Sequence, residues 1–338
     1  MRVLCIEKPG KLEIKEFPKP QLQPGQALIK MEMCGICGSD VTAYRGVNPT
    51  MKYPINGLGH EGVGVVVEVG DNPEGLKVGD RVALEPYVPC LKCHMCAEER
   101  WNNCADLHVC GVHKDGMMAE YFLHPTRQCF KIPDDMTFIH AALVEPFTIG
   151  LHGATRARVK AGEHVVVFGA GVIGLMASFA CINYGATPIL VDIIQERLDE
   201  AKAMGVPYIF NSKNGDVEEY LKEVTNGKLP EAMIDCTGAP AILGKMHDYV
   251  CHGGRIALIG WPHDPVMINT VRLMQKEIDV LPSRNSNKKF PEAIKLIHEG
   301  KLPVDALTTR TCRLEEVETV IQDMIKNPAD YLKVVVEI

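Results

Sequence analysis

Basic clusters and a leading apolar segment are both missing from this chain of 338 residues. Lysine and arginine number 36 against 43 acidic residues, the formal net charge is −7, and no dense basic run occurs. A protein that binds nucleic acid normally carries a basic face, so we expect no nucleic-acid partner. The N-terminus lacks the apolar core and the cleavage site of a signal peptide, so we expect a cytoplasmic protein.

Charged residues are absent from one long stretch, 165–191, which could span a bilayer by length alone. It contains four glycines, a proline, an asparagine and a tyrosine. These residues divide it into a strand, a turn, a helix, a turn and a second strand, so we expect no membrane segment. Internal repeats and low-complexity segments are also absent from the sequence.

Cysteine, by contrast, is abundant, with 13 residues. An odd number without a secretory signal argues against a disulfide framework. Four of the cysteines follow the spacing C-x2-C-x2-C-x7-C, and they are Cys90, Cys93, Cys96 and Cys104. The spacing is compatible with a closed metal site or with a C-x2-C redox pair, although a redox pair does not explain four cysteines.

The length favours two domains. The first 145 residues contain β-branched runs broken by glycine, proline and aspartate, as in "EGVGVVVEVG". Beyond them, strands alternate with helical patterns, which predicts a parallel sheet covered by helices on both faces. One of these patterns, "EAMIDCTG", predicts a strand followed by a helix ending near "CHGG", and the chain closes on the strand-like "LKVVVEI".

A glycine-rich turn, "VVVFGAGVIG", follows a run of valines and opens a predicted helix. In this context, Gly169, Gly171 and Gly174 fit a dinucleotide site: the first permits the turn, the second admits a pyrophosphate, and the third lets helix and strand pack closely. The helix N-terminus adds partial positive charge. We include Val172 and Ile173, the first predicted helical residues, in this cofactor site.

The cofactor preference depends on Asp192, at the end of the next strand and 18 residues beyond Gly174. Its carboxylate would accept hydrogen bonds from the ribose hydroxyls and repel a 2′-phosphate, so we predict NAD over NADP. Ile193 and Ile194 offer no cation to offset that repulsion. Arg197 is a further candidate cofactor contact. The alternative role of Asp192 is to cap the helix "QERLDEAKAMG".

A second possible metal site is spread along the chain. It comprises Cys37 in "CGICGSD", His60 and Glu61 in "GLGHEGVG", and Glu145 in "LVEPFTIG". One thiolate, one imidazole and one or two carboxylates suit a zinc ion with an open coordination position. The spacing alone leaves open a buried structural His60 and an uninvolved Cys37.

These motifs, with "LKVGDRV" and the four-cysteine segment, occur in the order found in the zinc-dependent medium-chain dehydrogenases, which the whole chain resembles. It is most similar to the polyol and sugar-acid branch. The resemblance implies an α/β fold: a GroES-like β-rich catalytic domain, 1–146 and 287–338, and a Rossmann doubly wound parallel sheet, 147–286, that binds NAD.

The resemblance also implies residue roles. Cys37 and His60 look like catalytic zinc ligands, Glu61 resembles a third ligand or its close neighbour, and Glu145 resembles an exchangeable ligand. Ser39 resembles the hydroxyl that takes the proton from the substrate while hydride passes to the nicotinamide. Thr42 departs from the pattern, because many relatives carry a histidine there as the outer end of the proton relay.

The resemblance assigns the four clustered cysteines to a structural zinc ion, giving two zinc ions per subunit. A site of four thiolates is closed, so the chemistry would belong to Cys37 rather than to the cysteine cluster. His94, inside the cluster, fits an exposed loop histidine.

Substrate residues are expected in "LPSRNSNKKFP", which is similar to the corresponding stretch of sugar-acid 5-dehydrogenases acting on L-galactonate, L-idonate or L-gulonate. Arg284 would bind a carboxylate, and Asn285 and Lys288 would bind hydroxyls or the acid. A solvated turn is the alternative. We predict that the substrate is a linear hexonate. The second candidate is a polyol such as sorbitol or galactitol, and the third is a threonine-type substrate.

A non-catalytic regulator that binds zinc and nucleotide is a further alternative. Proteins that evolve to such a role usually lose the zinc ligands or the relay hydroxyl, and this chain has both. Relatives pair through the edge strands of the Rossmann sheet, which implies a homodimer or homotetramer. The edge candidates are "RIALIGW" and "EIDVLPS".

Overall fold

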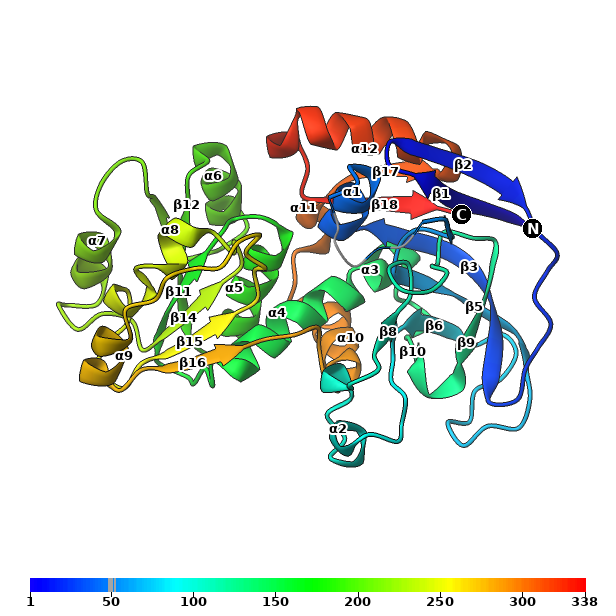
Figure 1. The fold of residues 1–338 in the computed structure, drawn as a ribbon, viewed down its shortest axis with the longest axis horizontal. Helices are drawn as coiled ribbons and strands as arrows, with labels where there is room; N and C mark the ends of the chain where they lie inside the picture. The colour runs from blue at the N-terminus through cyan, green and yellow to red at the C-terminus, as the bar shows by residue number, and fades with distance from the viewer. Residues whose placement is uncertain (48–50, 52) are drawn as a thin grey trace. The chain divides into compact units, whose positions relative to one another are not determined.

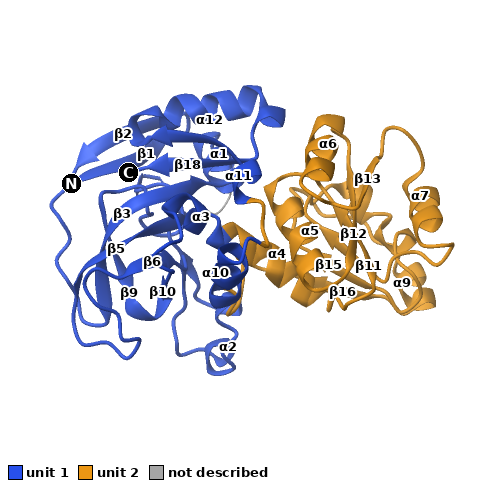
Figure 2. Ribbon diagram, turned by 180° about the vertical axis from the view of Figure 1, so that it is seen from behind, with its two compact units in different colours: residues 1–145, 290–300, 304–338 blue, residues 146–289, 301–303 orange. Residues whose placement is uncertain are grey.

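The chain divides into two compact units, each described here by itself (Figure 2). The computed structural model describes residues 1–47, 51 and 53–338. Unit 1 comprises residues 1–145, 290–300 and 304–338, and unit 2 comprises residues 146–289 and 301–303. The C-terminal segment therefore returns to the unit built from the N-terminal half.

Unit 1 is organised around a twisted sheet in which the C-terminal strand lies between strands from distant parts of the chain (Figure 1). The strand order is β10-β6-β5-β3-β18-β17, and β9 also pairs with β3. The strands are β3 (Gln26–Ile36), β5 (Glu61–Val69), β6 (Arg81–Leu84), β9 (Tyr121–Pro125), β10 (Cys129–Lys131), β17 (Thr308–Arg313) and β18 (Lys333–Glu337). Alternating side chains such as Ile29 and Met31 face a buried core.

Smaller elements complete unit 1. A second sheet has the order β2-β1-β4, and β7 pairs with β8. These strands are β1 (Arg2–Lys8), β2 (Lys11–Glu16), β4 (Ile55–Asn56), β7 (Tyr87–Val88) and β8 (His108–Val109). The helices are α1 (Gly38–Tyr44), α2 (His94–Ala97), α3 (Phe138–Ala142), α10 (Phe290–His298), α11 (Val304–Leu307) and α12 (Val317–Lys326).

Unit 2 contains a parallel sheet with the order β13-β12-β11-β14-β15-β16. This is the doubly wound order of dinucleotide-binding folds, so the predicted fold class is confirmed here. The strands are β11 (His164–Phe168), β12 (Thr187–Asp192), β13 (Tyr208–Asn211), β14 (Ala232–Asp235), β15 (Arg255–Leu258) and β16 (Asp279–Pro282). The helices are α4 (Val144–Arg156), which begins in unit 1, α5 (Val172–Asn183), α6 (Gln195–Ala203), α7 (Val217–Val224), α8 (Pro240–Leu243) and α9 (Thr270–Lys276).

Three sequence expectations can be compared with these elements. The uncharged stretch 165–191 forms β11, α5 and β12, and no helix in the described part of the chain is long and apolar enough to cross a membrane. The strand in "RIALIGW" is not at an edge, because β15 lies between β14 and β16, and the edges are β13 and β16. The helix expected to end near "CHGG" stops at Leu243, where Gly244 follows, and a separate 3₁₀ turn covers Met246–Asp248.

Candidate active site and metal centres

Strand register brings the distant ligand candidates of unit 1 together. Strand β3 ends immediately before Cys37, and β5 begins immediately after His60. The two strands are antiparallel and pair Gly35 with Glu61, so the end of one strand meets the start of the other. One ligand atom each of Cys37, His60 and Glu61 therefore lies within 4.8 Å of the others. This donor set fits a zinc ion, which binds thiolate, imidazole and carboxylate ligands.

The surroundings of His60 support this fit. The imidazole is buried, and its Nδ1 has no hydrogen-bond partner among the described residues. The buried Asp40 is close by, and its Oδ1 lies 3.9 Å from Nδ1. The other carboxylate oxygen of Asp40 accepts a hydrogen bond of 2.8 Å from the backbone N–H of Cys37. Asp40 thus fixes the loop that carries the thiol, as expected of a supporting residue.

Ser39 lies in the first turn of α1, two residues after Cys37. Its Oγ is buried and has no hydrogen-bond partner within the described residues. Thr42 is one turn further along, and its hydroxyl donates to the carbonyl of Ser39 over 2.9 Å. The Thr42 hydroxyl is therefore engaged locally, whereas the Ser39 hydroxyl has capacity for a ligand, because a buried hydroxyl without a partner carries a desolvation penalty.

Glu61 makes a buried ion pair that the sequence did not indicate. Both of its carboxylate oxygens accept from the Lys333 ammonium, at 2.6 and 2.7 Å, and the same ammonium donates to the Ile36 carbonyl at 3.0 Å. Lys333 opens β18, which pairs beside Ile36. Burial lowers the pKa of Lys333, but the nearby Glu61 carboxylate and Cys37 sulfur outweigh burial, so the pKa is raised overall and the ammonium stays charged.

Glu145 occupies the first turn of α4 and accepts a hydrogen bond from the Tyr87 hydroxyl. It is not a member of the group formed by Cys37, His60 and Glu61. Burial raises the pKa of Glu145 to about 7. Burial and the Glu145 carboxylate raise the pKa of the neighbouring Glu85 to about 8. Glu85 is therefore a further buried carboxylate near Glu145, which the sequence did not indicate.

The four-cysteine segment forms a separate, local group. All four thiols offer sulfur atoms within 4.8 Å of one another. Cys93 Sγ lies 3.6 Å from Cys96 Sγ and 3.9 Å from Cys104 Sγ. Tetrahedral zinc with bonds of about 2.3 Å places its sulfurs about 3.8 Å apart, whereas a disulfide needs about 2.05 Å. The spacing fits a structural zinc ion and no disulfide, and His94 is exposed.

The glycine turn of unit 2 has the shape that a dinucleotide requires. Gly169 has φ +99°, which favours glycine. A Cβ on Gly171 would meet nothing within 4 Å, so the backbone is open to a ligand, whereas a Cβ on Gly174 would come within 1.7 Å of the Gly169 carbonyl oxygen. Gly171 caps α5 without a side-chain hydrogen bond, and Val172 and Ile173 form the first turn. These backbone N–H groups fit a pyrophosphate.

Asp192 ends β12, beside this turn. Its Oδ2 accepts from the Ala170 N–H at 2.6 Å, and its Oδ1 accepts from the N–H groups of Ile193 and Ile194 at 2.6 and 2.9 Å. These hydrogen bonds to the Asp192 carboxylate therefore hold the glycine turn in position. The alternative role as a helix cap is not observed, because Ile194 occupies the N-cap of α6. Arg197, half-buried, lies in the first turn of the same helix.

The expected substrate residues follow β16 in unit 2. Arg284 and Asn285 are half-buried, and Lys288 is exposed. Asn285 and Lys288 have positive φ angles of 51° and 57°, so the backbone adopts the left-handed conformation at both residues. The buried Ser286 nearby has a hydroxyl without a hydrogen-bond partner among the described residues. These residues belong to a different unit from the ligands around Cys37.

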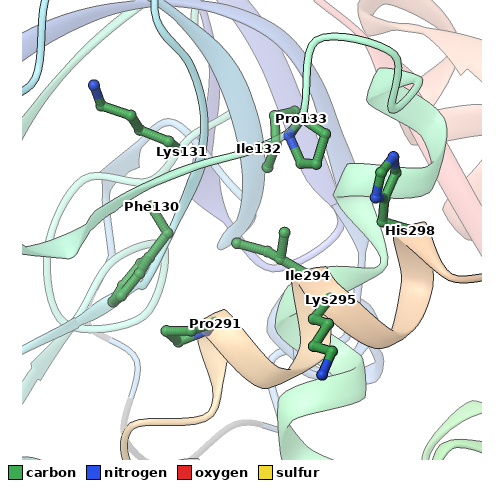
Figure 3. Close-up of a pocket in the computed structure, with 8 residues that line it drawn as sticks. All are labelled: Phe130, Lys131, Ile132, Pro133, Pro291, Ile294, Lys295 and His298. Atoms are coloured by element: carbon green, nitrogen blue, oxygen red, sulfur yellow. The ribbon is translucent and has the colours of Figure 1, made fainter.

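A surface hollow elsewhere in unit 1 does not coincide with this chemistry. It lies between β10 and α10 and is lined by apolar residues such as Phe130 and Ile294, with His298 at one side (Figure 3). None of the candidate metal ligands contributes to its lining. We assign the active site from donor chemistry rather than from this hollow.

Comparison with known proteins agrees with this geometry. Residues 23–134 match the alcohol dehydrogenase GroES-like domain, and residues 172–299 match the zinc-binding dehydrogenase domain. An uncharacterized zinc-type alcohol dehydrogenase-like protein of Haemophilus influenzae is 41% identical over 335 residues, covering 99% of this chain and 98% of that protein. Sorbitol dehydrogenase of Bacillus subtilis is 32% identical over 342 residues, covering 99% and 97%.

Among solved structures, an alcohol dehydrogenase of E. coli CFT073 in complex with NADH has a TM-score of 0.94 and 33% identity, covering 100% of this chain and 99% of that chain. The chain therefore belongs to the zinc-dependent medium-chain alcohol and polyol dehydrogenases, which are oxidoreductases that use a nicotinamide dinucleotide.

Proposed function

We propose that the protein oxidises a secondary hydroxyl of a linear, polyhydroxylated substrate to a ketone with NAD. The observation that carries this proposal is the group of Cys37, His60 and Glu61, with Ser39 two residues after Cys37 and its buried hydroxyl without a hydrogen-bond partner in the described part of the chain. In the proposed assignment Cys37 and His60 hold a catalytic zinc ion, and Glu61 or Glu145 completes its ligands. Cys90, Cys93, Cys96 and Cys104 hold the structural zinc ion.

A zinc ion held by these residues would supply positive charge that makes a substrate hydroxyl more acidic. The chain's own residues perform the remaining steps. Ser39 Oγ accepts the proton of the substrate hydroxyl while its own proton passes outward towards the cofactor ribose and solvent, and Asp40 keeps the Cys37 loop in place. The carbon–hydrogen bond at the same carbon breaks, and its two electrons pass with the hydrogen to the nicotinamide. The products are a ketone, NADH and a proton.

The proposed preference for NAD over NADP depends on Asp192. Three backbone N–H groups hold its carboxylate next to the glycine turn. A carboxylate in this place attracts ribose hydroxyls and repels a 2′-phosphate. Arg197 lies in the first turn of α6 and is the nearby cation that could weaken this repulsion. The preference is measured as the ratio of kcat/KM with NAD to that with NADP.

Two substrate classes have support. Arg284 and Lys288 offer cations that would pair with the carboxylate of a sugar acid such as L-galactonate or L-gulonate. The similarity to sorbitol dehydrogenase of Bacillus subtilis, at 32% identity, supports a neutral polyol instead. We propose the hexonate as the first candidate and the hexitol as the second.

The deciding experiment measures oxidation of hexonates and of hexitols by the absorbance of NADH. It uses both the parent protein and the Arg284→Leu variant. If hexonates are the substrates, Arg284→Leu raises their KM about tenfold or more and leaves hexitol oxidation unchanged. Activity on hexitols alone rejects the sugar-acid proposal. Absence of NADH formation with either class, in protein that contains zinc, rejects the proposed function.

We also propose that copies of the chain associate along β16. This strand is an edge of the parallel sheet, and the helix before it exposes Met274 (79%) and Val271 (60%). An open strand edge next to exposed apolar side chains fits pairing with a second copy. Analytical ultracentrifugation of Met274→Lys should show more monomer than the parent protein, and an unchanged distribution rejects this interface.

A further inference from the structure

The two glutamates of the proposed catalytic site are held by different kinds of partner. Glu61 is held by an ammonium group, because both oxygens accept from Lys333. Glu145, by contrast, has a neutral hydroxyl among its partners, that of Tyr87. An ammonium attracts a carboxylate through its full charge as well as through hydrogen bonds, whereas a neutral hydroxyl offers a hydrogen bond alone. The two carboxylates therefore differ in how readily each can leave its partner for a metal ion.

The position of Glu61 is also fixed by its backbone neighbours. Its Oε2 lies directly over Gly35, where a Cβ would come within 1.9 Å of that oxygen. Lys333 is held in turn by the Ile36 carbonyl and by the pairing of β18 with β3. Both side chains are buried, at 3% and 1% exposure, so water cannot replace either partner. The pair is a rigid part of the site.

Stabilisation of the fold does not account for this buried ion pair. A buried ion pair seldom stabilises a fold more than apolar residues of the same volume would, because both ions lose their hydration. Its placement is informative, since Glu61 also contributes a ligand atom to the group with Cys37 and His60. The ammonium and a metal ion would therefore attract the same two oxygens.

We propose that Lys333 is a positioning residue, which keeps Glu61 beside the catalytic metal ion but prevents Glu61 from coordinating that ion fully. Glu145 is then the carboxylate that binds and leaves the ion. The inference rests on the proposed function, because it concerns the metal site assigned there. Lys333 opposes the metal ion in two ways: its charge repels the ion, and it occupies the Glu61 oxygens. A zinc ion held by these residues would then offer an open position to a substrate hydroxyl.

The test measures zinc retention rather than turnover. Zinc-loaded protein is dialysed at about pH 9, where glutamate is ionised, against rising concentrations of dipicolinate, and bound zinc is counted. Cys37→Ser identifies which of the release steps belongs to the catalytic site. Lys333→Met should hold that zinc about tenfold more tightly or better, because one opposing charge is gone and Glu61 is free to coordinate. Lys333→Arg, which keeps the charge, should resemble the parent protein.

Lys276→Met is the matched control. Lys276 is also buried, but it lies in unit 2 and donates only to the backbone carbonyls of His247 and Val250 among the described contacts. Its loss should lower stability without moving the catalytic zinc step. If Lys333→Met does not fold, Lys333→Gln serves, because the amide can still donate to Glu61 and Ile36 without a charge.

The outcomes separate the two proposals. A parent protein that lacks a zinc step dependent on Cys37 contradicts the proposed function. A parent protein that shows this step, with Lys333→Met or Lys333→Gln releasing zinc at the same or a lower dipicolinate concentration, overturns the positioning role alone. Tighter retention in the Met and Gln variants, with no change in Lys276→Met, supports it.

Discussion

The two candidate metal-ligand groups of this protein are built in opposite ways. The cysteine group takes all four ligands from 15 consecutive residues, Cys90 to Cys104. The group around Cys37 takes its residues from the end of β3 and the start of β5, and Lys333, nearly 300 residues from Cys37 at the start of β18, pairs with Glu61. The first contains one kind of ligand on a local loop. The second contains a thiol, an imidazole and carboxylates in a buried, charged environment.

The difference reflects what each group must do. Four thiolates fill the coordination sphere of zinc, so the site can order a loop but cannot admit a substrate. Mixed ligands leave a position open, and their protonation and partners can be adjusted by burial. An open site needs rigid support from a folded sheet, which the register of β3, β5 and β18 provides.

The largest expected effect is a loss of turnover when the group around Cys37 is changed and the cysteine group is left intact. Cys37→Ser should lower turnover about ten-thousandfold, the rate equivalent of about 5 kcal/mol, because the charge that acidifies the substrate hydroxyl is lost. Zinc analysis should fall from about two ions per chain to about one, with the fold intact by circular dichroism. Loss of both ions would mean that the groups are not independent.

The second prediction concerns loss of the zinc ion from the cysteine group. Cys104→Ser, at a buried position of the cysteine group, should lower the free energy of unfolding by about 4 kcal/mol or more through loss of the metal. Activity per folded molecule should change little, since this group holds no substrate. His94→Ala is the control, because that side chain is exposed and should leave both zinc ions in place. The measurements are urea unfolding and zinc content.

The third prediction concerns acid stability of the sheet that supports the open site. Burial lowers the pKa of His124 on β9 to about 4, below the value of 6.5 in the unfolded chain. Its contribution to stability is therefore complete above pH 6.5 and is lost as the pH falls towards 4, by up to about 3 kcal/mol.

The acid-stability experiment uses urea unfolding at several pH values. His124→Gln keeps a donor for the Glu85 carbonyl, which His124 Nε2 now meets at 2.9 Å, but cannot titrate. The variant should show a flatter profile between pH 6.5 and 4. Parallel profiles for the two proteins would assign the acid sensitivity to other groups.

The fourth prediction concerns the proton acceptor. Ser39→Ala should lower kcat about a hundredfold, within the range of general base catalysis, while zinc content stays unchanged. Thr42→Val is the matched control, because its hydroxyl already donates to the Ser39 carbonyl and is not expected to carry the proton. An equal loss in both variants would indicate a disturbed α1 rather than a lost proton acceptor.

The smallest effect lies in unit 2, which contains neither metal group. Asp192→Ala should lower the ratio of kcat/KM for NAD to that for NADP about tenfold, because the repulsion of a 2′-phosphate is removed. Both zinc ions should remain bound. An unchanged ratio would show that Asp192 only braces the turn through Ala170.

Much of the architecture could be read in advance because its signals are local. The glycine turn, β11 and α5 follow from one short stretch, where apolar runs and glycine spacing specify strand, turn and helix. The cysteine group was visible for the same reason. The helix expected to end near residue 251 was wrong in extent, because α8 stops at Leu243 and a separate 3₁₀ turn follows it. The edge position expected for β15 was wrong, because β16 pairs with it.

The amino-acid sequence by itself therefore determined the order of strands and helices, the zinc-binding cysteine spacing and the dinucleotide turn, since each depends on neighbours within about 20 residues. Only the tertiary structure decided that Lys333 meets Glu61 and that Tyr87 meets Glu145. A lysine at the start of a valine-rich strand carries no sign of its partner. Strand register, which joins segments far apart in the chain, makes that choice.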